Sequence, residues 1–199
     1  MLKVTAKWPH IVVLSAALVL LMPAMAWAED MRGALGNYAS NRQAQLLDDK
    51  CHILNSEERP VIDTFVQDVQ AYVVAKAPRE QDTLRKLDET AQTAAAAESC
   101  GTAAKVVRDA YEDRLANSLA LAVIPYAWAM DVGERCEKIT PDEDNQIMKL
   151  YLARQQEVQQ KYGTAFFGKY AMIVHQADDK SQTFSCSDAR KMIDAVIGK

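Results

Sequence analysis

Four cysteines in two pairs of nearly equal spacing constrain this chain more than any other feature. Cys51 lies 49 residues before Cys100, and Cys136 lies 50 residues before Cys186. An even number of cysteines in an exported chain indicates disulfides, and the lack of a C-x-x-C motif argues against a thiol oxidoreductase site. Four cysteines permit three pairings, and the recurring spacing favours Cys51–Cys100 with Cys136–Cys186.

The first 28 residues have the pattern of a secretory signal peptide. Lys3 and Lys7 supply the positive start, residues 11–22 the apolar run, and residues 26–28 the small-residue cleavage site. The apolar run is too short to cross a hydrocarbon layer of about 30 Å, which argues against a membrane anchor. We therefore expect cleavage near Ala28 and a periplasmic or secreted protein with no transmembrane segment in the mature chain.

The charge of the mature chain limits its partners. Removal of Lys3 and Lys7 leaves 21 of the 23 basic residues against 27 acidic ones, a net charge of -6 (21 minus 27). Acidic and basic residues are mixed along the chain. Nucleic acids and anionic membranes bind a concentrated basic face, so we expect neither as a partner.

Helix-forming residues and helical spacing run through residues 29–199, which are predicted to form a single all-α domain. Apolar stripes at helical spacing follow two predicted N-caps, Asn55 and Thr140. Pro78 and Gly163 are predicted to separate helices, because the residue before proline avoids helical geometry and glycine favours helix ends. Residues 29–45 are polar and predict either a frayed segment or a weak helix.

The pattern around each cysteine pair recurs. Aligning Cys51 with Cys136 matches the predicted cap Asn55 with Thr140 and also matches several apolar positions. This recurrence predicts a helical bundle built from two similar disulfide-stapled halves, approximately 46–118 and 119–199; the alternative is two helical hairpins that converged on the same devices. In its helices bracketed by cysteines about 50 residues apart, each half resembles the small periplasmic acid-stress chaperones of the HdeA kind, which have one such unit.

Residues 119–130 form an uninterrupted apolar run that contains Pro125, a residue expected to kink a helix. Such a helix is normally buried on all sides, which predicts a central helix. The alternative is an exposed patch that docks a protein partner or an apolar ligand. The aromatic group Phe166, Phe167 and Tyr170, with Met172, is predicted by its spacing to belong to the core. The alternative is that it forms one wall of an apolar ligand pocket between helices. The candidate partner or ligand surface comprises Leu121, Ile124, Tyr126, Trp128, Phe166 and Tyr170.

Chemical motifs give no positive signal in this sequence. His52 and His175 lie in no metal-binding spacing, and acidic pairs at predicted helix starts are explained by the helix dipole. We therefore expect no catalytic residues, no metal and no cofactor. The leading hypothesis is a non-enzymatic interaction protein, such as a chaperone, adaptor or accessory subunit, with a protein partner. The alternatives are a carrier of an apolar small molecule and an enzyme whose site is not visible in sequence.

Overall fold

Helices dominate the part of the chain that the structure describes. This computed structural model describes residues 24–198, with side chains described from residue 33 onward. Most of the predicted signal peptide therefore lies outside the described residues. The elements in chain order are α2 (Ala24–Cys51), α3 (Arg59–Lys76), the 3-10 turn η2 (Pro78–Glu80), α4 (Gln81–Ala97), α5 (Cys100–Leu121), α6 (Ile124–Arg135), α7 (Pro141–Asp178), the 3-10 turn η3 (Asp179–Thr183) and α8 (Ala189–Ile197).

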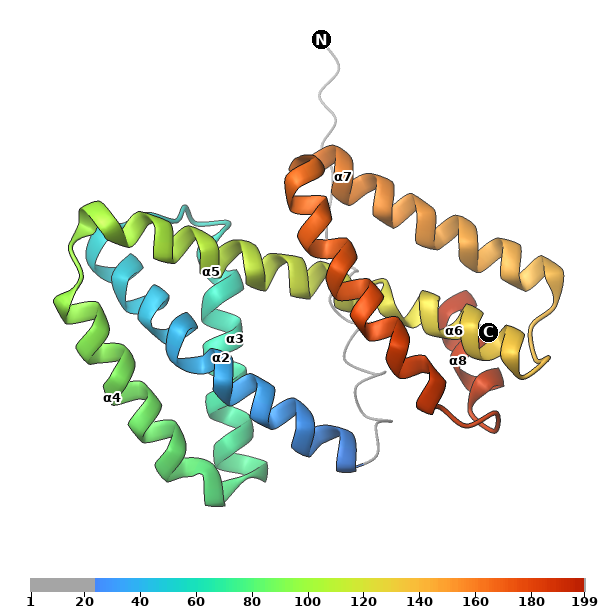
Figure 1. Ribbon diagram of the computed structural model, residues 1–199, viewed down its shortest axis with the longest axis horizontal. Coiled ribbons are helices and arrows are strands. Elements are labelled where there is room, and N and C mark those ends of the chain that lie inside the picture. The colour runs from blue at the N-terminus through green and yellow to red at the C-terminus, as the bar shows by residue number, and fades with distance from the viewer. Residues whose placement is uncertain (1–23, 199) are drawn as a thin grey trace, which may run out of the picture. The chain divides into compact units, whose positions relative to one another are not determined.

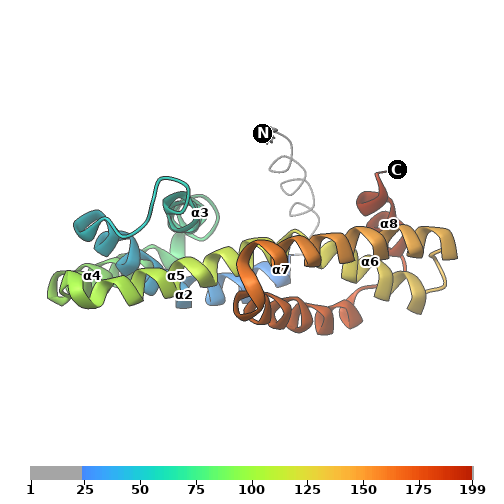
Figure 2. The ribbon, with the colours of Figure 1, turned by 90° about the horizontal axis from the view of Figure 1, so that it is seen from above.

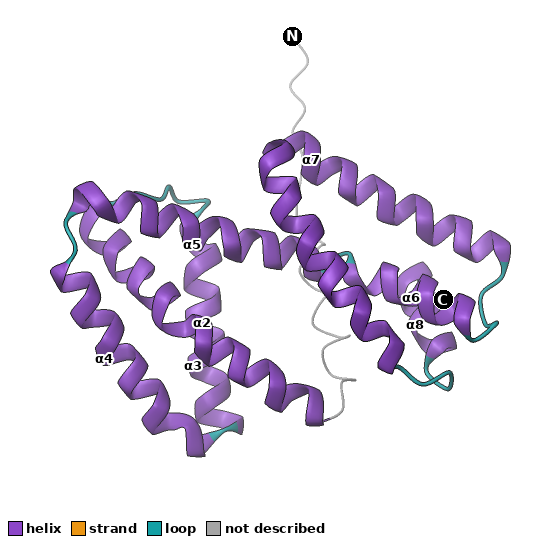
Figure 3. Ribbon diagram, in the orientation of Figure 1, coloured by secondary structure: helices purple, strands orange, loops and turns teal. Residues whose placement is uncertain are grey.

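The prediction of an all-α protein is confirmed for the described residues, which form helices joined by short loops (Figure 3). They pack as two compact units. The first unit comprises the described residues up to His52 together with Asp63–Ala103, and the second comprises Ile53–Ile62 and Ala104–Lys199. This division follows packing and not the sequence pattern, since it falls within α3 and within α5.

The first unit is built on α2, which is a continuous helix up to Cys51 despite its polar sequence. Its buried apolar side chains, among them Leu35, Tyr38 and Leu47, recur at helical spacing and face the interior. The buried side chains of α4 are the small residues Ala91 and Ala95, and α4 runs beside α2 (Figure 1). Packing against α4 therefore stabilises α2, whose polar composition predicts only a weak helix on its own.

The second unit contains α6, α7, η3 and α8 (Figure 2). The single kinked helix expected over residues 119–130 is absent, because α5 ends at Leu121 and α6 begins at Ile124. Pro125 lies in the first turn of α6, where a missing N–H leaves no helical hydrogen bond unmade. Gly163, at φ 82° and ψ 172°, divides α7 into two arms, residues 141–162 and residues 164–178.

Two disulfides close the chain, Cys51–Cys100 and Cys136–Cys186, with Cα atoms 5.5 and 5.4 Å apart. This is the pairing that the spacing favoured. The first bridge joins the last residue of α2 to the first residue of α5, and the second joins the residue after α6 to the loop before α8. Persistent disulfides are typical of proteins in an oxidising compartment.

The backbone after each first cysteine follows the same course. His52 and Glu137 both have a φ of 53°, a left-handed conformation that is uncommon outside glycine. Three residues further on, the Asn55 side chain accepts hydrogen bonds from two backbone N–H groups at the start of α3. Thr140 caps α7 with a full capping box, in which its hydroxyl accepts from the Glu143 N–H and the Glu143 carboxylate accepts from the Thr140 N–H.

An arginine from the helix after each second cysteine reaches back to these caps. Arg108 on α5 donates to the Glu58 carboxylate at 2.6 Å and to the backbone carbonyl two residues after Cys51. Arg190 on α8 donates to both carboxylate oxygens of Glu143, at 3.1 and 2.9 Å, and to the carbonyl two residues after Cys136. Bonds between two charged groups are among the strongest in proteins, so each arginine fixes its helix to a cap.

Candidate functional site

Five of the six residues of the candidate surface lie together in the second unit. Ile124 and Tyr170 are buried in one hydrophobic cluster, and Tyr126, Trp128 and Phe166 pack against it. Leu121 is different, because it is 69% exposed at the end of α5. The structure therefore assembles most of the predicted residues into a core and leaves one large apolar side chain at the surface.

Aromatic rings line this cluster along the second arm of α7. The rings of Tyr162 and Phe166 have centroids 4.8 Å apart across the turn at Gly163, and those of Phe167 and Tyr170 are 5.7 Å apart. Tilted ring pairs at this distance are favourable beyond the area that they bury. The cluster therefore ties the two arms of α7 together.

Tyr170 brings an unsatisfied hydroxyl into this apolar cluster. Its side chain has no exposure to solvent, and its hydroxyl has no hydrogen-bond partner. Burial, with a smaller contribution from nearby Tyr151, raises the pKa of Tyr170 to about 12. A buried polar group without a partner is uncommon in native proteins and requires an explanation.

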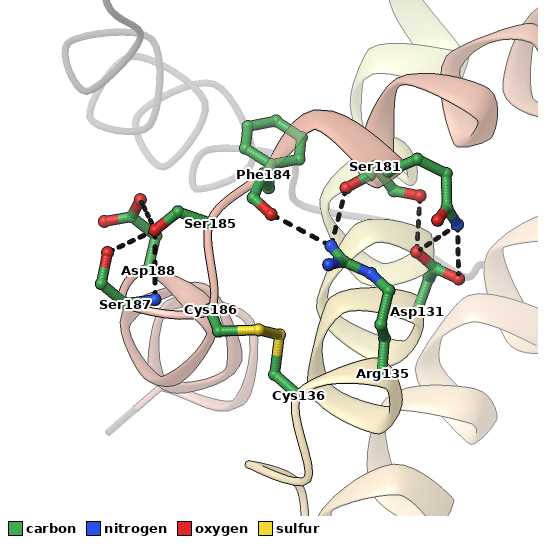
Figure 4. Close-up of a disulfide and its surroundings, with 10 residues drawn as sticks. Asp131, Arg135, Cys136, Ser181, Phe184, Ser185, Cys186, Ser187 and Asp188 are labelled. Carbon is green, nitrogen blue, oxygen red and sulfur yellow. Dashed lines mark hydrogen bonds between the residues drawn. A yellow bond between two sulfur atoms is a disulfide. The ribbon is translucent and has the colours of Figure 1, made fainter.

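One face of α6 holds the segment between α7 and α8. Ser181 donates to the Asp131 carboxylate at 2.6 Å, and Arg135 donates to the backbone carbonyls of Ser181 and Phe184 at 3.1 Å (Figure 4). Gln182 also donates to the Asp131 carboxylate. One turn earlier, the Trp128 indole N–H donates to a carbonyl at the end of α7, and its ring packs on Phe184.

We call these contacts, from residues 128–135 of α6 to residues 177–184, the α6 latch. Trp128, Asp131 and Arg135 share a helix face because they are three and four residues apart. The Cys136–Cys186 bridge continues the same line of contacts (Figure 4). Sequence analysis did not predict the latch, because its partners lie about 50 residues apart along the chain.

Carboxylates gather at the start of the latch. Burial is the main cause that raises the pKa of Asp178, and the neighbouring charges of Asp131 and Asp179 raise it further. His175 opposes this shift. Folding therefore disfavours the ionised form of Asp178 relative to the unfolded chain.

The first unit contains a polar network that the sequence analysis also missed. Tyr38 is fully buried, and its hydroxyl accepts from Gln70 at 2.7 Å and donates to Asp88 at 3.3 Å. Arg42 donates to the same Asp88 carboxylate at 2.7 Å, and Gln45 donates to Asp63. Three helices, α2, α3 and α4, contribute to this network. No local signal marks it, since its members are 18 to 50 residues apart.

Several large apolar side chains are exposed, and most of them lie in the second unit. Met172 is 57% exposed on the second arm of α7, and Leu152 is 52% exposed on the first arm. Within the second unit, Leu121 and Met172 are the most exposed of these side chains, and Val74, 64% exposed, is the counterpart in the first unit. Exposed methionine is common at surfaces that bind other proteins.

One stretch of the described residues, Cys100–Arg135, is long and apolar enough to cross a membrane by length and composition. A core helix of a soluble protein passes the same test, so this finding is weak evidence. Ala120, Val123 and Ile124 within the stretch are buried in the aromatic cluster. The turn between α5 and α6 also interrupts it.

Within residues 24–198, no group of three or more His, Cys, Asp or Glu side chains is placed to hold a metal ion. His52 and His175 are both exposed. Comparison with known proteins adds no assignment: no protein-family model matches the chain, and neither does any curated protein or solved structure.

Proposed function

We propose that this chain is an exported protein that folds in the periplasm or outside the cell after cleavage near Ala28. The two disulfides support this location, because such bonds persist in oxidising compartments. Free cysteines are absent from the residues that the structure describes. The signal-like pattern of residues 1–28 is the second support.

Its proposed activity is the binding of a protein partner, as a chaperone, adaptor or accessory subunit. The supporting observation is the exposure of Leu121 and Met172 in the second unit, at 69% and 57%. Each exposed apolar side chain that a partner covers contributes roughly 25 cal/mol per Å² of apolar area removed from water. A protein partner that covers both side chains would remove this exposed apolar surface from water.

Site-specific photo-cross-linking tests this proposal. A photoreactive amino acid would replace Leu121, Met172 or Val74 in separate variants, expressed in the cells from which the chain comes. We expect the same protein adduct from positions 121 and 172, and none from position 74, whose side chain is equally exposed but lies in the first unit. Adducts of equal yield from all three positions, or from none, would contradict the proposal.

A second candidate function, transport of an apolar small molecule, is favoured by the hydroxyl of Tyr170. This group is buried without a partner inside an aromatic cluster, and a polar atom of a ligand would satisfy it. Native mass spectrometry of the protein purified from its own cells distinguishes the two functions. A carrier retains a small hydrophobic compound, and a Tyr170→Phe variant would retain less of it.

We also propose that the chain consists of two similar halves. The left-handed residues His52 and Glu137, the caps at Asn55 and Thr140, and the arginines that reach back to each cap support this relation. Aligned on Cys51 and Cys136, the helix breaks at Pro78 and Gly163 also coincide, because both lie 27 residues after the aligned cysteine (78 minus 51, and 163 minus 136).

Equivalent halves should respond equally to equivalent changes. Replacing Arg108 or Arg190 with methionine removes one cap contact in each half, and we expect similar losses in the free energy of unfolding. The measurement is urea unfolding of both variants. A loss confined to one of them would argue that the two halves only converged on similar caps.

A further inference from the structure

A single glycine interrupts α7. Gly163 has φ 82° and ψ 172°, a backbone region that is open almost only to glycine. The residues on both sides of it are helical, so the two arms would form one continuous helix if Gly163 became helical. Crowding does not explain the glycine, because a Cβ atom at this position would meet no other atom within 4 Å. Its backbone conformation is the reason.

The arms bury their apolar faces against each other and against α6. Val158 from the first arm and Tyr170 and Val174 from the second arm belong to one core cluster. The α6 latch holds the end of the second arm, and Arg190 holds α8 to the start of the first arm through Glu143. Every contact of this kind joins a residue before Gly163 to one after it.

We propose that the second unit can exchange these contacts with a second copy of the chain. In the exchanged form Gly163 is helical, α7 is continuous, and residues 164–198 of each copy pack on α6 and on the first arm of the other copy. The two forms share the same core, latch and Arg190 contacts, so they differ mainly at the hinge and in the entropy of association. Because the hinge is a single residue, Gly163 is either in the turn conformation or helical, so each chain is either fully exchanged or not exchanged.

The second disulfide controls this exchange. Cys136 lies before the hinge and Cys186 lies after it, so a bridge within one chain keeps residues 164–186 beside their own α6. Exchange therefore requires reduced chains. When two exchanged chains are reoxidised, each bridge joins Cys136 of one copy to Cys186 of the other. Each bridge forms from two thiols, which lose two electrons and two protons to one glutathione disulfide and leave two molecules of glutathione.

The first disulfide serves as an internal reference. Cys51 and Cys100 both lie before Gly163, so their bridge stays within one chain in the monomer and in the exchanged dimer. A peptide map of the dimer can therefore distinguish exchange from random disulfide scrambling, because scrambling would join cysteines of both pairs between chains.

Refolding at different protein concentrations tests the proposal. The protein would be unfolded and reduced in denaturant with dithiothreitol, then refolded in a glutathione redox buffer as an equal mixture of ¹⁴N- and ¹⁵N-labelled chains. We expect the fraction of dimer to increase with protein concentration. In this dimer, disulfide-linked peptides of Cys136 and Cys186 should combine ¹⁴N and ¹⁵N chains, whereas those of Cys51 and Cys100 should not. Protein oxidised as a monomer and then concentrated should stay monomeric.

Substitutions at two glycines of α7 supply the matched comparison. Gly163→Ala penalises the left-handed turn and favours the helix, so we expect its dimerisation constant to rise by roughly tenfold or more. Gly168→Ala lies within the second arm at a position with open space, and it should dimerise as the parent does. A third variant, with two glycines inserted after Gly163, should remain monomeric because a longer loop relaxes the turn.

The outcomes are distinct even if one variant fails to fold. A parent protein that refolds only as a monomer at every concentration overturns the proposal, as does a dimer whose Cys136–Cys186 pairs are isotopically pure. An inserted variant that dimerises as readily as the parent would also overturn it, because the hinge would then have no part in the exchange.

Discussion

Two buried tyrosines should respond in opposite directions to the loss of their hydroxyl groups. Tyr38 and Tyr170 are both fully buried. The Tyr38 hydroxyl bonds to Gln70 and Asp88, whereas the Tyr170 hydroxyl has no partner. Replacing each with phenylalanine removes one oxygen from the same kind of side chain, so the difference between the variants reports hydrogen bonding and not volume.

The expected magnitudes follow from the cost of burying polar groups. An unsatisfied buried donor costs about 1–3 kcal/mol, so Tyr170→Phe should raise the free energy of unfolding by about 1 kcal/mol. Tyr38→Phe leaves Gln70 and Asp88 each without one partner, so it should lower the free energy by about 1–2 kcal/mol. The two variants should therefore differ by roughly 2–3 kcal/mol, with opposite signs relative to the parent.

Urea unfolding measures both changes, with circular dichroism for the whole chain. Trp8 and Trp27 precede the expected cleavage site, so Trp128 fluorescence then reports the second unit alone. The slope of the free energy with urea should stay constant, as expected for a change in stability only. If Tyr170→Phe is destabilising by 1 kcal/mol or more, the hydroxyl has a partner in solution, and the argument from an orphaned group is wrong.

High pH gives an independent check of the same group. The pKa of Tyr170 rises from 10.0 to about 12 on folding, so the unfolded chain loses this proton first. Ionisation of this group therefore leaves the free energy of unfolding unchanged below pH 10 and lowers it as the pH rises from 10 toward 12. Tyr170→Phe lacks this loss, so its advantage over the parent should widen across that interval in unfolding experiments.

The remaining predictions concern Gly133, Asp178 and Arg190 of the second unit, with Gly168 as a control. Gly133→Ala should destabilise by about 1–3 kcal/mol in urea unfolding, because the new Cβ would lie 2.9 Å from Ile139 Cβ, whereas Gly168→Ala should be neutral or stabilising. Asp178→Asn should stabilise near neutral pH, since the folded state raises the pKa of this carboxyl; the gain should vanish as acid protonates Asp178, and a gain that persists at pH 2 would refute this cause. Arg190→Met should lower the midpoint of thermal unfolding, because Glu143 loses its ion pair, and an unchanged midpoint would show that the cap holds without it.

Helix boundaries were predictable because their signals are local. The cap at Thr140 and the breaks at Pro78 and Gly163 depend on residues within one turn, and the structure places helix ends or a helix break there. The same holds for Pro125, although it starts α6 and does not kink one long helix. Proline is compatible with both outcomes, and the packing of neighbouring side chains decides between them.

The contacts that organise each interior were not predictable from local pattern. The polar sequence of α2 conceals a helix, because its stabilising partner Asp88 is 46 residues beyond Arg42. Trp128 was predicted as part of a partner or ligand surface, and its spacing gave no sign that its indole N–H donates to a carbonyl 49 residues away. Sequence spacing gives the face of a helix that is apolar, but it does not give the partner that covers this face.

The buried polar side chains of α2 have a consequence for temperature. Asn41, Gln45 and Asp48 are all buried on α2, so unfolding exposes more polar surface there than in the aromatic interior of the second unit. Polar exposure lowers the heat capacity of unfolding and apolar exposure raises it. The stability of the first unit should therefore vary less with temperature than that of the second unit, which weakens more on cooling.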